Sequence, residues 1–139
     1  MANKFKKIIA LSAMLLVTVC AFSQAPDDPA EQKKFDEAID KSVEHYEQML
    51  GLEDWQVFYA DSILRHDYAA MRVELADLSR ARVSNSDIYV QVQDKWQEKI
   101  YVAFKRILDE PQWTKYLKSG AARDKKARDK RAEKFAGNE

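Results

Sequence analysis

The chain has 139 residues, with 23 basic and 23 acidic side chains, three Gly, three Pro and one Cys. This length indicates one domain, and a formal charge of zero excludes a uniformly basic nucleic-acid-binding protein. One Cys excludes a disulfide scaffold and a four-thiolate zinc site, and the few Gly and Pro are typical of long helices rather than of a turn-rich β-sandwich.

The first residues predict export. Three lysines precede residues 8–22, a run of 15 residues without charge. A spanning helix needs about 20 apolar residues, so this run is short for a retained membrane anchor and fits a signal peptide that is cut after Ser23. Lipidation at Cys20 is the less favoured alternative, because Val19 before it is not a small residue. We therefore expect residues 1–23 to be removed and the protein to be periplasmic or secreted.

A first helix is predicted from Pro29 to Leu50. Asp28 can cap it, Pro29 suits its first position, and Gly51 is a natural stop. Its apolar residues recur at steps of three and four: Phe35, Ile39, Val43, Tyr46, Met49 and Leu50. An acidic stripe lies on the same helix and is interpreted as a solvated face: Asp36, Asp40, Glu44 and Glu47.

A long second helix is predicted from Glu53 or Asp54 to Val83, because neither Gly nor Pro interrupts it. About 30 residues give a helix of about 45 Å, which implies an elongated molecule. One apolar face is expected to contain Trp55, Phe58, Tyr59, Ser62, Ile63, His66, Ala70, Val73 and Ala76. Five further apolar residues are expected to broaden this face: Leu64, Tyr68, Met71, Leu75 and Leu78.

Turn-forming residues 84–87 then break the chain, and a third helix is expected up to Leu108. The second and third helices should form a long antiparallel hairpin. A short fourth helix with Trp113 should end near Gly120. The fold class is therefore all-α, with about four helices in a domain spanning residues 24–120.

The C-terminal region, residues 121–139, is a charged tail. Residues 118–135 contain eight basic and three acidic side chains, and Phe135 is the one large apolar residue after Gly120. Such a segment cannot bury itself, so a frayed helix or a disordered tail is expected. The tail has two candidate partners, an anionic membrane surface and the acidic body of the protein itself.

Two segments share one pattern, residues 52–56 (LEDWQ) and 108–112 (LDEPQ). In the second, Asp109 and Gln112 can form a reciprocal capping box, and Leu108 can pack on Trp113 as a hydrophobic staple. In the first, Glu53 is a poor cap, so the neighbouring Asp54 is expected to take its place. The predicted helix-start motif consists of Leu52, Gln56, Leu108, Asp109 and Gln112.

The pair of segments resembles the Leu-Thr-x-x-Gln motif that occurs twice in the Spy/CpxP family of small periplasmic helical proteins. Glu53 and Asp109 stand where that motif has Thr. The resemblance covers residues about 35–120. It implies a curved antiparallel dimer that acts as an ATP-independent chaperone or as a modulator of envelope stress.

Aromatic residues are abundant in the helical body, and two interpretations apply to them. Most belong in a core or a dimer interface, but a thin helical layer cannot bury all of them, and some can line a surface that binds unfolded segments. The candidate client-binding residues are Trp55, Phe58, Tyr59, Trp96, Phe104 and Trp113.

Enzymatic chemistry is not expected. His45 and His66 are the only imidazoles, too few for a zinc site of three or four protein ligands, and His66 is interpreted as a partly buried structural residue. The sequence has neither a nucleophile elbow nor a Gly-rich phosphate loop. No metal or cofactor is therefore predicted.

The preferred hypothesis is an exported chaperone or envelope-stress modulator. It is expected to bind exposed apolar segments of unfolded or envelope proteins without nucleotide, as a homodimer. The alternatives are an adaptor or sensor that binds one specific envelope partner, and a metal-responsive periplasmic protein. Nucleic acid is not an expected partner because export separates the chain from it.

Overall fold

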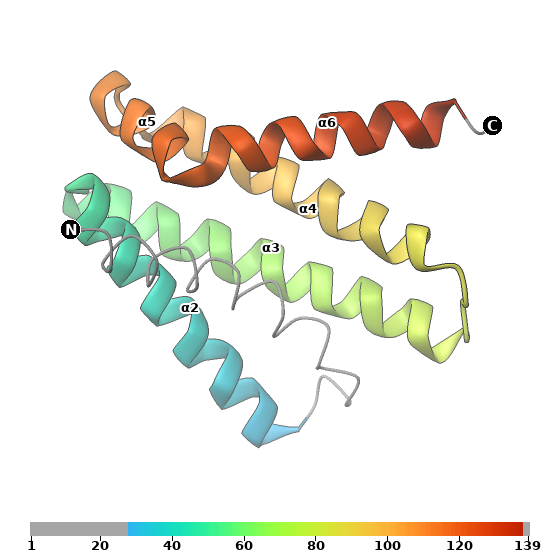
Figure 1. The fold of residues 1–139 in the computed structure, drawn as a ribbon. Coiled ribbons are helices and arrows are strands. Elements are labelled where there is room, and N and C mark those ends of the chain that lie inside the picture. The colour runs from blue at the N-terminus through green and yellow to red at the C-terminus, as the bar shows by residue number, and fades with distance from the viewer. Residues whose placement is uncertain (1–27, 138–139) are drawn as a thin grey trace, which may run out of the picture.

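The computed structural model describes residues 28–137; the predicted signal peptide, its cleavage after Ser23 and Cys20 lie outside this range. The described part is all-α, as expected, and contains no strand. Its elements are α2 (Pro29–Leu50), α3 (Asp54–Arg80), α4 (Ser86–Ile107), α5 (Glu110–Tyr116), a π-helical turn η1 (Leu117–Ala121) and α6 (Ala122–Ala136). Figure 1 shows α3 and α4 side by side, with α2 along α3 and α6 returning along α4.

The ends of α2 follow the local sequence signals. The Asp28 side chain accepts a hydrogen bond of 2.9 Å from the Ala30 amide, and Pro29 occupies the first turn. Gly51 adopts the left-handed conformation, with φ of 65°, and ends the helix. A residue without Cβ takes this conformation at little energetic cost, which confirms Gly51 as the predicted stop.

The predicted antiparallel hairpin is formed by α3 and α4, but α3 ends at Arg80 rather than at Val83. Arg82 has φ of 54°, the Val83 amide donates to the Leu78 carbonyl, and the Arg82 amide donates to the Ser79 carbonyl. These bonds form a Schellman motif. Such a motif normally contains Gly at the left-handed position, so Arg82 carried no signal of a helix end.

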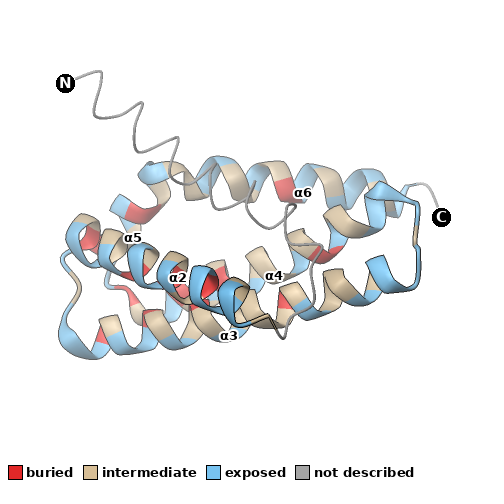
Figure 2. Cartoon of the chain, turned by 90° about the horizontal axis from the view of Figure 1, so that it is seen from below, coloured by how far each residue is buried: buried red, intermediate tan, exposed pale blue. Residues whose placement is uncertain are grey.

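The core lies where α2, α3, α4 and α5 meet. Its fully buried members include Ile39 and Leu50 from α2, Leu64 from α3 and Phe104 from α4. Aromatic rings fill the end near α5, where Phe104 stacks on Tyr116 with ring centroids 5.3 Å apart. Figure 2 shows exposed residues on every described helix, so residues 28–137 form a thin layer in which no helix is enclosed.

The C-terminal region is an ordered helix, and the expectation of a frayed or disordered tail is wrong for residues 122–136. At Gly120 the chain leaves helical geometry, with φ of 124°, and α6 then runs back along α4. Arg128 and Arg131 of α6 form ion pairs with Glu98 and Asp94 of α4. The basic segment is therefore stabilised by the acidic body of the same chain, one of its two predicted partners.

Candidate functional site

The two copies of the motif meet in the structure. Gln56 and Gln112, 56 residues apart, lie at the third position of α3 and α5, and their side chains form two reciprocal hydrogen bonds of 2.6 and 2.9 Å. Each amide oxygen also accepts from the backbone amide of its own cap residue, Glu53 at 2.9 Å and Asp109 at 3.0 Å. Both glutamines are buried, with 3% and 8% of their surface exposed.

The remaining protons of the two amides reach across the molecule. Gln56 donates to the Ile107 carbonyl at 2.7 Å, and Gln112 donates to the Gly51 carbonyl at 3.2 Å. These carbonyls end α4 and α2, so each glutamine joins the start of one helix to the end of another. Because every polar atom of the two side-chain amides has a hydrogen-bond partner, the buried pair is tolerated here. The pair also fixes how the starts of α3 and α5 lie against the ends of α4 and α2.

The first copy corrects one expectation. Glu53, not Asp54, is the cap residue of α3, and Asp54 is the first helical residue. The Gln56 side chain bonds to the Glu53 amide, which sets the start of the helix whatever the quality of the Glu53 side chain as a cap. The Glu53 carboxylate also accepts a hydrogen bond of 2.7 Å from the Trp55 indole.

The expected apolar face of α3 is wrong for the first turns of the helix, whereas Ile63 packs against the core and Leu64 and Met71, which were expected to broaden the face, are buried. The helix buries Gln56, Ala60, Leu64 and Met71. Trp55, Phe58 and Tyr59, which we call the aromatic trio, are 49%, 69% and 52% exposed. Phe58 and Tyr59 pack edge to face with centroids 5.7 Å apart, and Trp55 packs on Tyr59 at 6.2 Å, so the three rings form one exposed cluster.

The other three candidate aromatic residues lie elsewhere. Phe104 is completely buried in the core, so its assignment to a client-binding surface is wrong. Trp113 is half-buried against the core and packs edge to face on Tyr101, with centroids 5.0 Å apart. Trp96 is half-buried at the α3–α4 contact, where its indole donates to Glu74 at 2.8 Å. The structure therefore brings together the trio alone.

Beside the trio, α3 carries a shallow hollow of about 390 Å³, lined by Phe58, Asp61, Ser62, Arg65 and His66. Arg65 binds three carboxylates there: Asp61 of its own helix at 2.8 Å, and Asp36 and Asp40 of α2 at 2.9 and 2.8 Å. The hydrogen bonds that Arg65 donates to Asp61 and Asp40 raise the pKa of Arg65, so its guanidinium stays charged. The sequence interpretation missed this cluster, although Asp36 and Asp40 were recognised as one stripe.

His66 is exposed, which contradicts its assignment as a partly buried residue; 77% of its side chain is accessible, and it contacts Asp67. Among residues 28–137, no group of three or more His, Cys, Asp or Glu side chains is arranged to hold a metal ion. No helix in this same range has the length and apolar character needed to cross a membrane.

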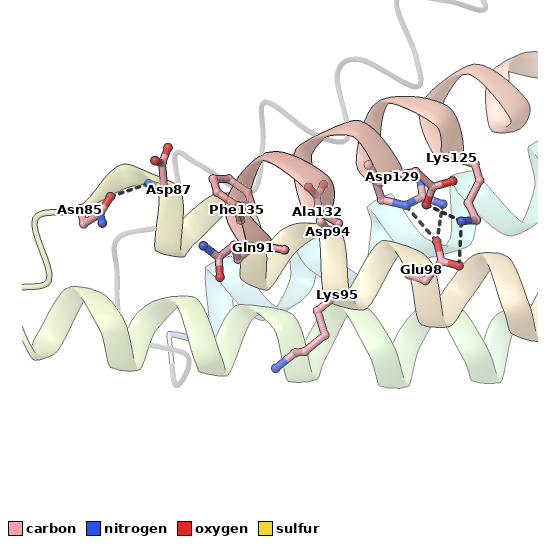
Figure 3. Close-up of a pocket in the computed structure, with 12 residues that line it drawn as sticks. Asn85, Asp87, Gln91, Asp94, Lys95, Glu98, Lys125, Asp129, Ala132 and Phe135 are labelled. Atoms are coloured by element: carbon pink, nitrogen blue, oxygen red, sulfur yellow. Dashed lines mark hydrogen bonds and ion pairs between the residues drawn. The ribbon is translucent and has the colours of Figure 1, made fainter. Parts of the chain in front are cut away.

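A second hollow, of about 700 Å³, separates α4 from α6. Figure 3 shows Gln91 and Glu98 of α4 facing Phe135 and Lys125 of α6 across it. Lys125 binds Glu98 at 3.5 Å, and Arg128 lies over the Tyr101 ring at 5.5 Å. Charged groups that are already paired bridge this groove.

No known family model, curated protein or solved structure matches the chain. The resemblance to the Spy/CpxP family stays a prediction that depends on the two motif copies.

Proposed function

We propose that the protein is a nucleotide-independent chaperone of the cell envelope, similar in action to the Spy/CpxP family, which binds exposed apolar segments of unfolded proteins. The observation that carries this proposal is the aromatic trio. Large aromatic rings are the side chains that most often anchor protein interfaces, and three of them at the surface of one helix are a candidate binding patch.

Two further features support the proposal. The buried Gln56–Gln112 pair fixes both copies of the motif, so the trio at the start of α3 is attached to a well-defined scaffold. The thin helical layer also leaves apolar residues exposed outside the trio, including Val73 further along α3 and Val102 of α4. We propose that the protein is a homodimer after removal of its signal peptide, and that it needs neither metal nor cofactor.

The test is an aggregation assay with reduced α-lactalbumin and protein purified from cells that express the full chain. We expect suppression of light scattering at a few-fold molar excess. A Phe58→Ser/Tyr59→Ser variant should lose most of this effect, whereas Val102→Ser, which changes an exposed apolar residue outside the trio, should retain it. An inactive wild-type protein at several-fold excess would contradict the proposal.

Two measurements separate the proposal from its alternatives. Capture from an envelope extract should recover many weakly bound proteins; one stoichiometric partner would identify an adaptor or sensor instead. Scattering should give a mass near twice that of the mature chain, and mass spectrometry of the exported protein should place its N-terminus at Gln24. Residual membrane association after cleavage would implicate the exposed basic side chains of α6.

A further inference from the structure

The surface around the aromatic trio is strongly acidic. Glu53 and Asp54 immediately precede Trp55 at the start of α3, and both are exposed. Asp61 lines the hollow that begins at Phe58. The apolar patch is therefore bordered by carboxylates at both of its ends along the helix.

Helix α2 adds to this charge. Asp36 and Asp40 reach Arg65 from α2, and their side chains remain 43% and 67% exposed. One guanidinium faces three carboxylates, because Asp61 binds it as well. Arg65 can neutralise only one of these charges, so the cluster carries an excess of negative charge toward solvent.

We propose that this surface selects cationic amphipathic segments, in which aromatic or aliphatic side chains are flanked by Lys or Arg. The inference rests on the proposed function and specifies its client class. The trio would bind the apolar side chains, and the carboxylates of Asp40, Asp54 and Asp61 would attract the flanking cations. Complementary charge mainly increases the association rate and excludes segments of the wrong sign.

The geometry favours this client class over an acidic one. An acidic segment placed on the trio would bring its carboxylates close to Asp54 and Asp61, and like charges at a desolvated contact are unfavourable. Arg65 offers little compensation, since its guanidinium already donates to Asp36, Asp40 and Asp61. A second copy of this chain is the competing occupant of the patch.

The experiment uses two fluorescein-labelled 12-residue peptides with the same apolar residues, one with flanking lysines and the other with flanking glutamates. Anisotropy should give at least about tenfold tighter binding of the lysine peptide in 50 mM salt. The ratio should fall below about threefold in 1 M salt, where the screening length is about 3 Å. Equal binding of both peptides, or preference for the glutamate peptide, would overturn the inference but leave the proposed function intact.

Variants locate the selectivity. Asp40→Asn/Asp54→Asn should reduce the preference several-fold while circular dichroism stays unchanged. Asp77→Asn is the matched control, because Asp77 is an exposed carboxylate at the far end of α3, paired with Arg80, and its loss should leave the preference unchanged. Binding of neither peptide would contradict both the inference and the proposed function. A dimer that dissociates in Phe58→Ser/Tyr59→Ser would assign the patch to a second copy and overturn the inference.

Discussion

The two halves of the described chain follow one plan and then diverge. Helices α2 and α4 have 22 residues each, and each is followed by Leu, a capping box and Gln at the third helical position. In the first half, α3 then continues for 27 residues without a break. In the second half, α5, η1 and α6 have 7, 5 and 15 residues and together match the length of α3.

The difference arises where the chain contacts the core. Ala60 and Tyr116 occupy equivalent buried positions, but the next equivalent pair is Leu64, which is 1% exposed, and Gly120, which has φ of 124°. Leu64 anchors a straight helix, whereas Gly120 permits a bend that returns α6 along α4. The same capping pattern therefore starts α3 and α5, and the residue four positions after the next buried contact determines whether the helix continues or bends.

The largest expected effect comes from removing one glutamine of the buried pair that joins the two halves. Gln112→Ala would leave the Asp109 amide, the Gly51 carbonyl and one side-chain amide proton of Gln56 without the partner that Gln112 supplies. Unsatisfied buried polar groups cost about 1–3 kcal/mol each, so we expect a loss of about 2–4 kcal/mol in the free energy of unfolding, measured with urea. Gln48→Ala, which removes an exposed bond to Glu44, should change it by less than about 0.5 kcal/mol.

The same pair offers a stricter test. Gln56→Leu/Gln112→Leu removes both partners together, so its destabilisation should be smaller than the sum of the two single changes. Additive losses would show that the two amides do not act as a unit and would contradict the described pairing.

The next effect concerns the point of divergence. Gly120→Ala places a Cβ at φ of 124°, a conformation that residues with side chains rarely adopt. We expect destabilisation of about 1–3 kcal/mol in the same urea assay. Gly137→Ala is the matched control, since φ there is −80° and the free energy should stay within about 0.5 kcal/mol. Equal effects at both glycines would argue against a strained bend.

The third prediction concerns the packing of α6 on α4. Ion pairs make most of this contact, whereas α3 packs on the core through apolar side chains. Asp94→Asn/Glu98→Gln removes the carboxylates that bind Arg131 and Arg128. We expect amide exchange in residues 122–136 to become about tenfold faster, because each charge-assisted bond contributes about 1.5 kcal/mol. Amides of α3 should keep their protection, and so should α6 in Asp129→Asn. Unchanged exchange in α6 would mean that these ion pairs do not hold it.

The smallest expected effect concerns the contact between the halves. Hydrogen bonds from Lys95 and Trp96 lower the pKa of Glu74, so its charge stabilises the fold above the ordinary Glu range and this contribution disappears as pH falls through the lowered pKa. Because the pair is partly exposed, Glu74→Gln should cost less than about 1 kcal/mol at neutral pH. The difference in Tm between wild type and variant should shrink toward pH 3; a constant difference would contradict this assignment.

Local signals predicted most of the elements. The caps at Asp28 and Asp109, the left-handed stop at Gly51 and the helix-start motif depend on residues close in sequence, and the structure confirms them. The end of α3 at Arg80 was not predicted, because Arg82 adopts the left-handed conformation, which an arginine in the sequence does not indicate. The exposed side of α3 was misjudged because its apolar residues cover more than one face, so periodicity alone does not identify the face that packs.

The sequence by itself determined an all-α chain, its helix starts and the two copies of the motif, because helical periodicity and capping act over a few residues. Only the tertiary structure decided that Gln56 bonds to Gln112, that Arg65 gathers three carboxylates and that α6 folds back onto α4. Apart from Asp61, which is four positions from Arg65, each of these contacts joins residues 25 or more positions apart, and such pairing depends on how whole helices pack against one another.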